Sequence, residues 1–434
     1  MDLVSSILER FYDKENGELK IGGMCVGSLA SQYGTPLYIY DRGILEKKLT
    51  DLRKALPINF SISYSVKANP NIAILKFFLE KGCGLEIASL GEFRLAQIAG
   101  CALKEIVFAG PSKTVEELQE IIPFHIGEIH VESELEIERI TAISSQLGTK
   151  TRVGLRVNPT GTAEGGAMRM GGKSTQFGID EECLDSVIEK MLLAKSLEFC
   201  GIHIYSGTQI LDHKVLIRQY RKGLEISRRI ALRFGKPLKT VDFGGGLGIP
   251  YFGNEQELNM MGFREGLAEL MEEITNDPLF AGTRFLVEPG RYLVGEAGIY
   301  VSKINDIKVS RGKKYLILDG GMNHHLAASG NLGQVIKRHF PTALITKLDQ
   351  KPVENVDIVG PLCTPLDTLA KNIYLPSASV DDLVGIFQSG AYGLTASPVG
   401  FLSHATPAEI LIDDQAAQVI RVRGSHQQEL LFKV

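Results

Sequence analysis

The feature that most constrains the fold is a regular alternation of short apolar runs with amphipathic runs, which begins near residue 60. The apolar runs have the length and composition of strands, and the runs that follow carry apolar residues at helical spacing. The eighth strand-like run is TRFLVEPGR at residues 283–291. Eight strand–helix repeats between residue 60 and residue 291 predict an α/β fold, a (β/α)8 TIM barrel, at residues 37–290. A doubly wound open sheet remains the alternative, because strand order cannot be read from a sequence.

The segments on either side of the expected barrel have a different pattern. After residue 290 the chain contains strand-like runs such as KYLILDGG and DDLVGIFQSGAYG without alternating helices. Residues 291–434 are therefore expected to form a second, C-terminal β domain. Residues 1–36 are expected to join this domain, and TPLYIYD at residues 35–41 is a candidate strand that would pair with the C-terminal strands.

The composition excludes several functional classes. The chain has 47 basic and 51 acidic side chains, a formal net charge of −4, so nothing in its charge favours nucleic acid binding. Its six cysteines are scattered without a C-x-x-C pair, so we expect no metal site and a reducing, cytoplasmic setting. Because the first residues lack a signal-peptide pattern and no run of about 18 apolar residues occurs, we expect neither export nor a membrane span.

A lysine stands where the first strand of the expected barrel ends. In FSISYSVKANPN, residues 60–71, apolar residues alternate with serines, and Asn69-Pro70 ends the strand directly after Lys67. A lysine at a strand end is usually solvated. Barrel enzymes, however, carry their chemistry at the carboxyl ends of the strands, so Lys67 lies where an active site is expected.

Other polar residues and glycines end the neighbouring strands and are expected to meet Lys67 at the same rim. Glycine backbone amides and an arginine favour a phosphate, which TIM barrels often hold near the last two strands. A lysine, a phosphate pocket, a carboxylate and a histidine on one rim are the groups that pyridoxal 5′-phosphate requires. The residues at these strand ends are Glu86, His203, Ser206, Gly244, Gly245, Gly246, Glu288 and Arg291.

Glu288 indicates the type of reaction. A carboxylate at the pyridine nitrogen keeps that nitrogen protonated, and the protonated ring is a strong electron sink for a carbanion at Cα. Decarboxylation benefits most from this sink, whereas a basic partner at this position would suit racemisation. Two roles stay open for His203, which are stacking on the cofactor ring and ordinary packing in the core.

Six motifs in order resemble the fold-type III pyridoxal-phosphate decarboxylases, the group of ornithine and diaminopimelate decarboxylases. The motifs are YSVKANPN, HIYSGTQ, GGGLGIPY, EPGRYLVGEAG, GPLCTPLD and GAYG. The match covers nearly the whole chain. Several motifs in the right order are far more specific than any one of them. The resemblance therefore raises Lys67 from a surface lysine to the residue that bonds covalently to the cofactor.

The resemblance also implies a role for the other motif residues. His203 would stack on the cofactor ring, Glu288 would bond the pyridine nitrogen, and Glu86 would lie near the cofactor. Cys363 matches a cysteine that reaches into the other subunit's active site and helps to handle the proton at Cα, which implies a homodimer with shared sites. The residues implied for the phosphate are Ser206, Gly245, Gly246, Arg291 and Tyr392.

Two departures from the family pattern bear on the substrate. Ornithine and diaminopimelate decarboxylases carry an acidic residue directly after this cysteine, where the chain has Thr364, and Tyr205 replaces a small glycine of the histidine motif. Both positions are expected to contact substrate, and both changes argue against free ornithine, lysine and diaminopimelate. Motifs such as DGGMNHH resemble a smaller branch that includes a decarboxylase of glutamate held as a thioester on an acyl carrier protein. In the loop GTAEGGAMRMGGKSTQ, Arg169 and Lys173 are candidate contacts for such a carrier or its phosphopantetheine arm.

The expected function is thus pyridoxal-phosphate-dependent decarboxylation of an amino acid in a biosynthetic pathway, with a carrier-tethered, glutamyl-type substrate. Within the same class, the alternative is a free-amino-acid decarboxylase such as diaminopimelate decarboxylase. From another class, the alternative is a regulatory protein that binds pyridoxal phosphate without catalysis. The single-domain barrel proteins of that kind lack a second domain, which this sequence is expected to have.

Overall fold

The structure is a computed structural model that describes residues 3–161, 168–169, 174–205, 207–334 and 337–425. Its contacts divide the chain into two compact units. One unit comprises Thr50–Ile249 and Glu257–Gly290, and the other comprises Met1–Leu49, Pro250–Gln256 and Arg291–Val434. The expected domain boundaries at residues 36 and 290 stay a prediction. The division into units differs from them in the segments 37–49 and 250–256.

The first unit is a closed barrel of parallel strands. Neighbouring strands pair in the order β5, β6, β7, β8, β9, β12, β14 and β15, and β15 pairs with β5 to close the ring. This closure confirms the predicted TIM barrel and excludes the open sheet. The strands are β5 (Phe60–Ser65), β6 (Gly84–Ile87), β7 (Ile106–Phe108), β8 (Glu128–Val131), β9 (Thr151–Asn158), β12 (Leu197–Ile204), β14 (Thr240–Asp242) and β15 (Arg284–Val287).

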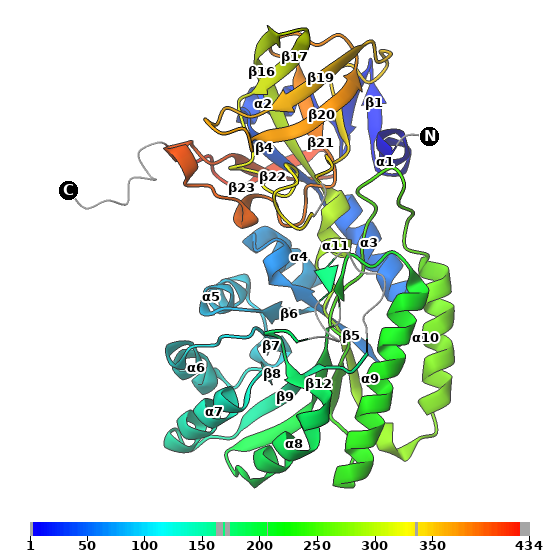
Figure 1. Ribbon diagram of the computed structural model, residues 1–434, viewed down its shortest axis with the longest axis vertical. Helices are drawn as coiled ribbons and strands as arrows, with labels where there is room; N and C mark the ends of the chain where they lie inside the picture. The colour runs from blue at the N-terminus through cyan, green and yellow to red at the C-terminus, as the bar shows by residue number, and fades with distance from the viewer. Residues whose placement is uncertain (1–2, 162–167, 170–173, 206, 335–336, 426–434) are drawn as a thin grey trace, which may run out of the picture. The chain divides into compact units, whose positions relative to one another are not determined.

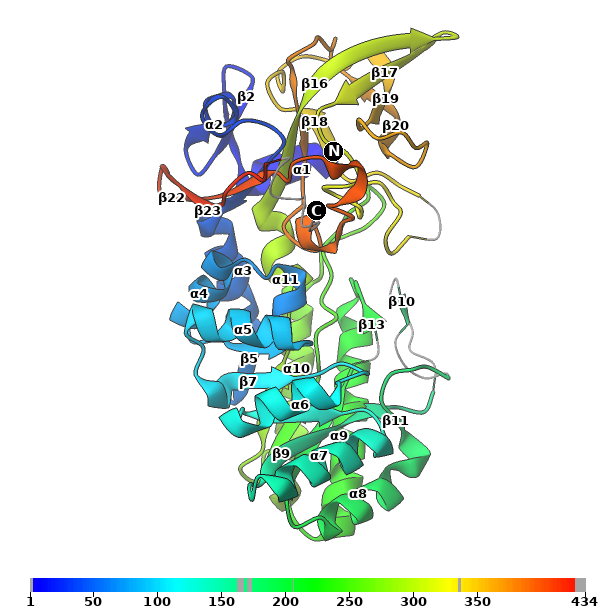
Figure 2. The same ribbon diagram turned by 90° about the vertical axis from the view of Figure 1, so that its left-hand side faces the viewer.

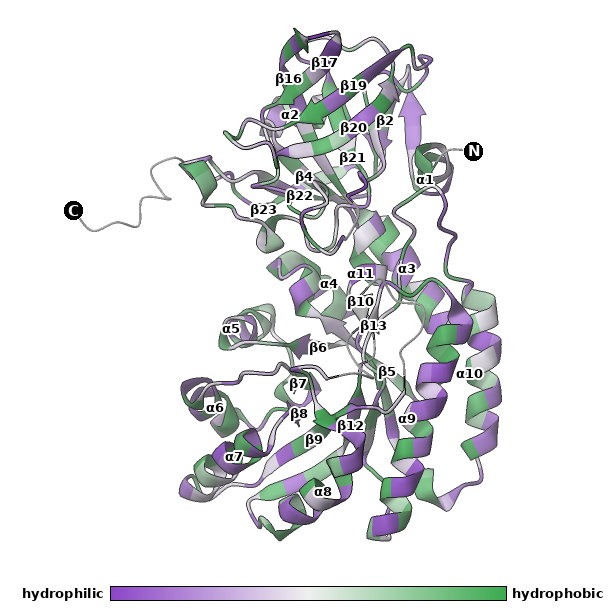
Figure 3. Cartoon of the chain, in the orientation of Figure 1, coloured by the Kyte–Doolittle hydropathy of each residue, from purple (hydrophilic) through white to green (hydrophobic). Residues whose placement is uncertain are grey.

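Amphipathic helices cover the outside of this barrel (Figures 1 and 2). Most of these helices begin at a side-chain cap, such as Ser89 on the amide of Glu92 and the reciprocal pair of Thr114 and Glu117. On α9 and α10 hydrophobic residues alternate with hydrophilic ones at helical spacing (Figure 3). The helices are α4 (Ile72–Glu80), α5 (Leu90–Ala99), α6 (Val115–Ile121), α7 (Glu134–Gln146), α8 (Leu184–Leu193), α9 (His213–Phe234) and α10 (Met260–Ile274).

Strand β5 shows how the sequence positions the active site. The Tyr64 ring stacks on Phe78 of α4 at 4.3 Å, so the apolar positions of β5 face the helices. The alternate positions point into the barrel, where the Ser65 hydroxyl donates a hydrogen bond to Glu86 of β6. The strand face that reads as polar in the sequence is therefore the face that lines the barrel interior.

The second unit is built around a mixed sheet with the order β20-β19-β17-β16-β4-β22-β23, to which β18 and β21 add on β16. Strand β4 (Leu37–Asp41) pairs antiparallel with β16 and parallel with β22, which confirms the expected pairing of TPLYIYD. The sheet strands are β16 (Gly298–Ser310), β17 (Lys313–Leu318), β18 (Thr342–Leu344), β19 (Glu354–Val359), β20 (Thr368–Leu375), β21 (Leu383–Ile386), β22 (Ala408–Asp413) and β23 (Ala416–Arg421).

The N-terminal segment packs on this second unit through a shared hydrophobic core. Ile7 of α1 (Leu3–Phe11) and Leu29 of α2 (Val26–Tyr33) lie in one buried cluster with Ile299 and Ile410 of the sheet. The small antiparallel sheet of β1 (Asp13–Glu15), β2 (Glu18–Ile21) and β3 (Met24–Cys25) lies between these helices in the chain. Among the described residues, no helix is both long and apolar enough to cross a membrane.

Candidate active site

Lys67 lies in a single helical turn, Val66–Ala68, directly after β5. Its Nζ lies 2.8 Å from both carboxylate oxygens of Glu86 in β6. The Glu86 side chain is 1% exposed, whereas the Lys67 side chain is 46% exposed. A buried carboxylate thus holds an accessible amine at the carboxyl end of the barrel, as the strand-end position predicted.

Glu288 and His203 form a second polar pair at the same end of the barrel. His203 lies in β12 and Glu288 follows β15, and His203 Nε2 lies 3.2 Å from Glu288 Oε2. Burial alone would raise the pKa of Glu288, but His203, His130 and Lys67 together hold its pKa well below the usual value. Burial lowers the pKa of His203, although Glu288 opposes this effect. Glu288 is therefore ionised at neutral pH.

Two further buried residues, which the sequence analysis did not identify, extend this pair. The two residues are His130 of β8 and Asp242 of β14. They form a cluster with His203 and Glu288 in which one ring nitrogen or carboxylate oxygen of each residue lies within 4.8 Å of the others. Burial and the Glu288 carboxylate raise the pKa of Asp242 well above its usual value. His203 was identified because it lies near the carboxyl end of a strand. The same rule applies to His130 in EIHVES and to Asp242 in TVDFGGG.

The glycines after β14 form a tight turn beside Glu288. Gly244 and Gly246 have φ of +64° and +103°, which favour glycine. A Cβ on Gly245 would lie 2.5 Å from the backbone oxygen of Glu288, and one on Gly246 would lie 2.9 Å from that of Gly207. The turn therefore brings bare backbone to the rim, which is the arrangement that suits a phosphate.

Gly245→Ala is expected to weaken pyridoxal-phosphate binding at least about tenfold, because the added Cβ must displace the backbone that carries Glu288. Equilibrium dialysis with the cofactor measures this change. Gly253→Ala is the matched control, since a Cβ there would meet nothing within 4 Å. Unchanged affinity in a folded Gly245→Ala variant would remove this turn from the phosphate site.

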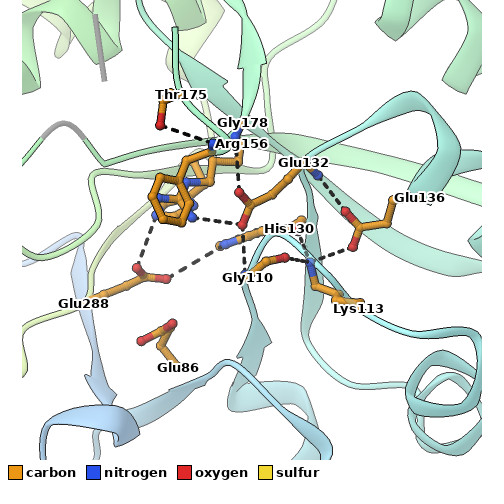
Figure 4. A network of polar contacts seen from close by, with 12 residues as sticks. Glu86, Gly110, Lys113, His130, Glu132, Glu136, Arg156, Thr175, Gly178 and Glu288 are labelled. Atoms are coloured by element: carbon orange, nitrogen blue, oxygen red, sulfur yellow. Dashed lines mark hydrogen bonds and ion pairs between the residues drawn. The ribbon is translucent and has the colours of Figure 1, made fainter. Parts of the chain in front are cut away.

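An ion-pair network around Glu132 fixes the wall on the β8–β9 side (Figure 4). Arg156 Nη1 donates to Glu132 Oε1 at 2.9 Å, and Glu132 also accepts from the amides of Gly110 and Gly178 at 2.9 and 3.1 Å. The Arg156 guanidinium lies 5.9 Å from the centre of the Tyr205 ring. Tyr205 thus contributes an aromatic surface next to a fixed cation.

In the second unit, Arg291 lies with two tyrosines. Its Nη1 donates to the hydroxyl of Tyr251 at 3.1 Å, and its guanidinium lies 4.8 Å from the centre of the Tyr392 ring. Tyr392 has φ of +53°, a left-handed conformation that costs free energy and is often found at functional sites. Tyr251 is the last residue of the motif GGGLGIPY. Its contact with Arg291, 40 residues away, was not predicted, because no local pattern links the two residues.

Cys363 and Thr364 lie in the loop between β19 and β20. Cys363 is exposed and is not part of a disulfide. Asp367 holds the loop by accepting hydrogen bonds from the amides of Leu362 and Met322 at 2.9 and 2.7 Å. The loop therefore presents a thiol to the surface from a fixed backbone.

The remaining candidates fall on or next to residues that are not described. Ser206 and Lys173 lie outside the described residues. Arg169 lies in the short strand β10 (Met168–Arg169), which pairs with β13 (Gly207–Thr208). The phosphate role of Ser206 and the carrier contacts of Arg169 and Lys173 stay predictions.

Comparison with known proteins agrees with this geometry. Residues 42–295 match the family of pyridoxal-dependent decarboxylases, pyridoxal binding domain. The chain is 36% identical over 403 residues to the L-glutamyl-[BtrI acyl-carrier protein] decarboxylase of Niallia circulans, covering 92% of this chain and 94% of the relative. It is 33% identical to a Zymomonas mobilis diaminopimelate decarboxylase, covering 95% and 96%. A solved structure, "Diaminopimelate Decarboxylase from m. jannaschii in co-complex with L-lysine", covers 97% of both chains with a TM-score of 0.90 and 26% identity.

The chain belongs to the pyridoxal-dependent decarboxylases. It is a carboxy-lyase that uses pyridoxal 5′-phosphate. The residues of the barrel fit this cofactor: a half-exposed amine at Lys67, an ionised carboxylate at Glu288, and a glycine turn that a Cβ would fill. In the described part of the chain, Glu288 Oε1 is buried without a hydrogen bond, so it is available to a cofactor group.

Proposed function

We propose that this decarboxylase acts on an amino acid whose side chain is tethered to a carrier protein, with a glutamyl thioester as the preferred substrate. The observation that carries the proposal is the 36% identity, over nearly the whole length, to a relative named for such a substrate. Decarboxylation removes the α-carboxylate, so the thioester must be formed on the side-chain carboxyl. The distal end of this substrate is then uncharged, which agrees with Thr364 in the position where diamino-acid decarboxylases are expected to carry an acid.

The residues of the barrel have complementary roles in this reaction. Pyridoxal phosphate, when bound, would supply an electron sink for the carbanion at Cα. Glu288 would hold the pyridine nitrogen, and His203 would support the ring face. Lys67 would hold the cofactor covalently, and Glu86 keeps the lysine amine at the rim through the 2.8 Å contacts to its Nζ.

The phosphate is assigned to the glycine turn of Gly245 and Gly246, with Ser206, Arg291 and Tyr392. The cation of Arg291 supports this assignment, because an arginine fork matches phosphate oxygens. The hydroxyl of Tyr251, 3.1 Å from Arg291 Nη1, orients the guanidinium.

We also propose that the working enzyme is a homodimer, in the cytoplasm, whose active sites are shared between subunits. Cys363 is exposed on a loop of the second unit that Asp367 holds in place. In the proposed dimer this thiol donates a proton to Cα in the partner's site, where the proton takes the place of the carboxylate that has left as carbon dioxide. A thiol has the short reach and the acidity that such a transfer requires.

Subunit mixing tests the shared site. Lys67→Ala and Cys363→Ala are each expected to be far less active than the wild type. If sites are shared, random exchange makes half of the dimers hybrid, each with one intact site, so the mixture should recover about one quarter of wild-type activity. Carbon dioxide release before and after exchange measures the recovery. No recovery, once exchange has been demonstrated with tagged subunits, would contradict a shared site.

Intact-mass spectrometry tests the tethered substrate. A glutamyl carrier protein, loaded through the side-chain carboxyl, should lose one carbon dioxide per chain when the enzyme and pyridoxal phosphate are added. Lys67→Ala serves as the negative control. A tethered substrate that stays intact, while free diaminopimelate is decarboxylated, would favour the alternative, a diaminopimelate decarboxylase like the relative from Zymomonas mobilis. Cofactor binding with no decarboxylation of any substrate would favour the non-catalytic alternative.

A further inference from the structure

His130 is a buried imidazole at the centre of the barrel. It is fully buried, and it projects from β8 toward Glu288 (Figure 4). Its Nδ1 lies 3.9 Å from Glu288 Oε1, and its Nε2 lies 3.5 Å from Glu128 Oε1 and 3.9 Å from Asp242 Oδ2. The ring lies 4.6 Å from that of His203. Lys113 reaches only its backbone, by donating to the carbonyl oxygen at 2.6 Å.

The polar atoms of this cluster are poorly satisfied by the protein. Within the described residues, both ring nitrogens of His130 and the facing oxygens of Glu128, Asp242 and Glu288 are buried without a hydrogen bond. Such groups cost free energy unless a small movement or a bound group satisfies them. Because His130 faces Glu288 Oε1, it is placed to share that oxygen with the cofactor.

The sequence makes room for this imidazole at Gly154 of β9, the strand between those of His130 and His203. A Cβ on Gly154 would lie 3.0 Å from His130 Cδ2 and 2.1 Å from Glu128 Oε1. Any other residue at this position would displace one of the two side chains. The cluster therefore depends on a glycine in the neighbouring strand.

A metal ion is a poor occupant for this cluster, although two histidines and two carboxylates have the composition of a metal site. The rings of His130 and His203 are stacked with only 23° between their planes. An imidazole nitrogen binds a metal in the plane of its ring, so near-parallel stacked rings direct their lone pairs side by side rather than toward one point. The stack instead gives His203 a flat support on one face.

We propose that His130 is a positioning residue for the decarboxylation, which supports the His203 ring by stacking and the Glu288 carboxylate by facing its Oε1. The proposal rests on the proposed contacts of His203 and Glu288 with the cofactor. Two substitutions separate the two actions. His130→Phe keeps a flat ring against His203 but removes both nitrogens, whereas His130→Asn keeps a polar group but removes the ring.

Three readouts are compared in the folded, cofactor-loaded enzyme. They are the dissociation constant for pyridoxal phosphate, the pH dependence of the visible absorption of the bound cofactor, and the separate changes in kcat and KM. Both variants should lower kcat about tenfold to a hundredfold with little change in KM, as misplacement of reacting groups does. His130→Phe should also move the pH midpoint of the absorption change by about one unit, because Glu288 loses a facing imidazole. His130→Asn should weaken cofactor binding about tenfold, because His203 loses its support.

Controls separate this inference from the proposed roles on which it rests. His125→Asn, an exposed histidine before β8, should leave all three readouts unchanged. If Glu288→Gln and His203→Ala leave the spectrum and the cofactor affinity unchanged, the proposed roles of those residues are wrong. If those two variants alter the readouts and both His130 variants match the wild type, only the role of His130 is wrong. Failure of both His130 variants to fold would also contradict it, since a positioning residue leaves the cofactor-free barrel intact.

Discussion

Lys67→Ala is expected to abolish the visible absorption of bound pyridoxal phosphate and to lower kcat by at least about 10³-fold, as loss of a covalently acting residue does. Lys67 Nζ is the amine that the structure places at the barrel rim, held by Glu86 and still 46% exposed on its side chain. Removing it leaves the cofactor without its covalent attachment.

Borohydride reduction provides the direct measurement. In the wild type, reduction should fix the cofactor on the peptide that contains Lys67, as detected by mass spectrometry. Lys76→Ala is the matched control, since this lysine is exposed on the helix that follows. The assignment is wrong if Lys67→Ala retains both the absorption band and a cofactor that borohydride can fix.

The sequence predicted the barrel because each strand and helix has its own periodicity. It also predicted that Lys67 and Glu288 lie at the carboxyl end of the barrel, because both residues follow a strand. It could not show which face of a short strand points inward. In EIHVES, four residues form β8, and the pattern alone does not decide that Glu128 and His130 line the interior.

Contacts between distant segments could also not be predicted from the sequence. The pairing of Arg291 with Tyr251 joins residues 40 positions apart, and it depends on how the chain returns after β14. The same holds for Tyr205 beside Arg156, which depends on the register of β9 against β12. Register is set by the packing of the whole barrel, so local patterns predict the residues of a site better than their partners.

The second large effect concerns the substrate. A substrate with a cationic distal group should be disfavoured by at least about a hundredfold in kcat/KM, because burying an ammonium without a partner costs about 3 kcal/mol or more. Thr364, next to Cys363 on the loop held by Asp367, offers a hydroxyl and no charge. A side-chain thioester is neutral and avoids this cost.

Thr364→Asp is the informative variant for this selectivity. An added carboxylate should improve kcat/KM for free diaminopimelate or lysine by about tenfold, because it pairs with the distal ammonium. It should not improve turnover of the tethered glutamyl substrate. Equal effects on both substrates would mean that Thr364 lies away from the distal group.

The central claim is tested most directly by steady-state kcat/KM for one enzyme preparation with a carrier-loaded glutamyl thioester and with free glutamate, lysine and diaminopimelate. We predict a value at or above about 10⁴ M⁻¹s⁻¹ for the carrier-loaded substrate, typical of a true substrate, and values at least about a hundredfold lower for the free amino acids. Turnover of free diaminopimelate or lysine at or above about 10⁴ M⁻¹s⁻¹, with the carrier-loaded substrate inert, would contradict the claim.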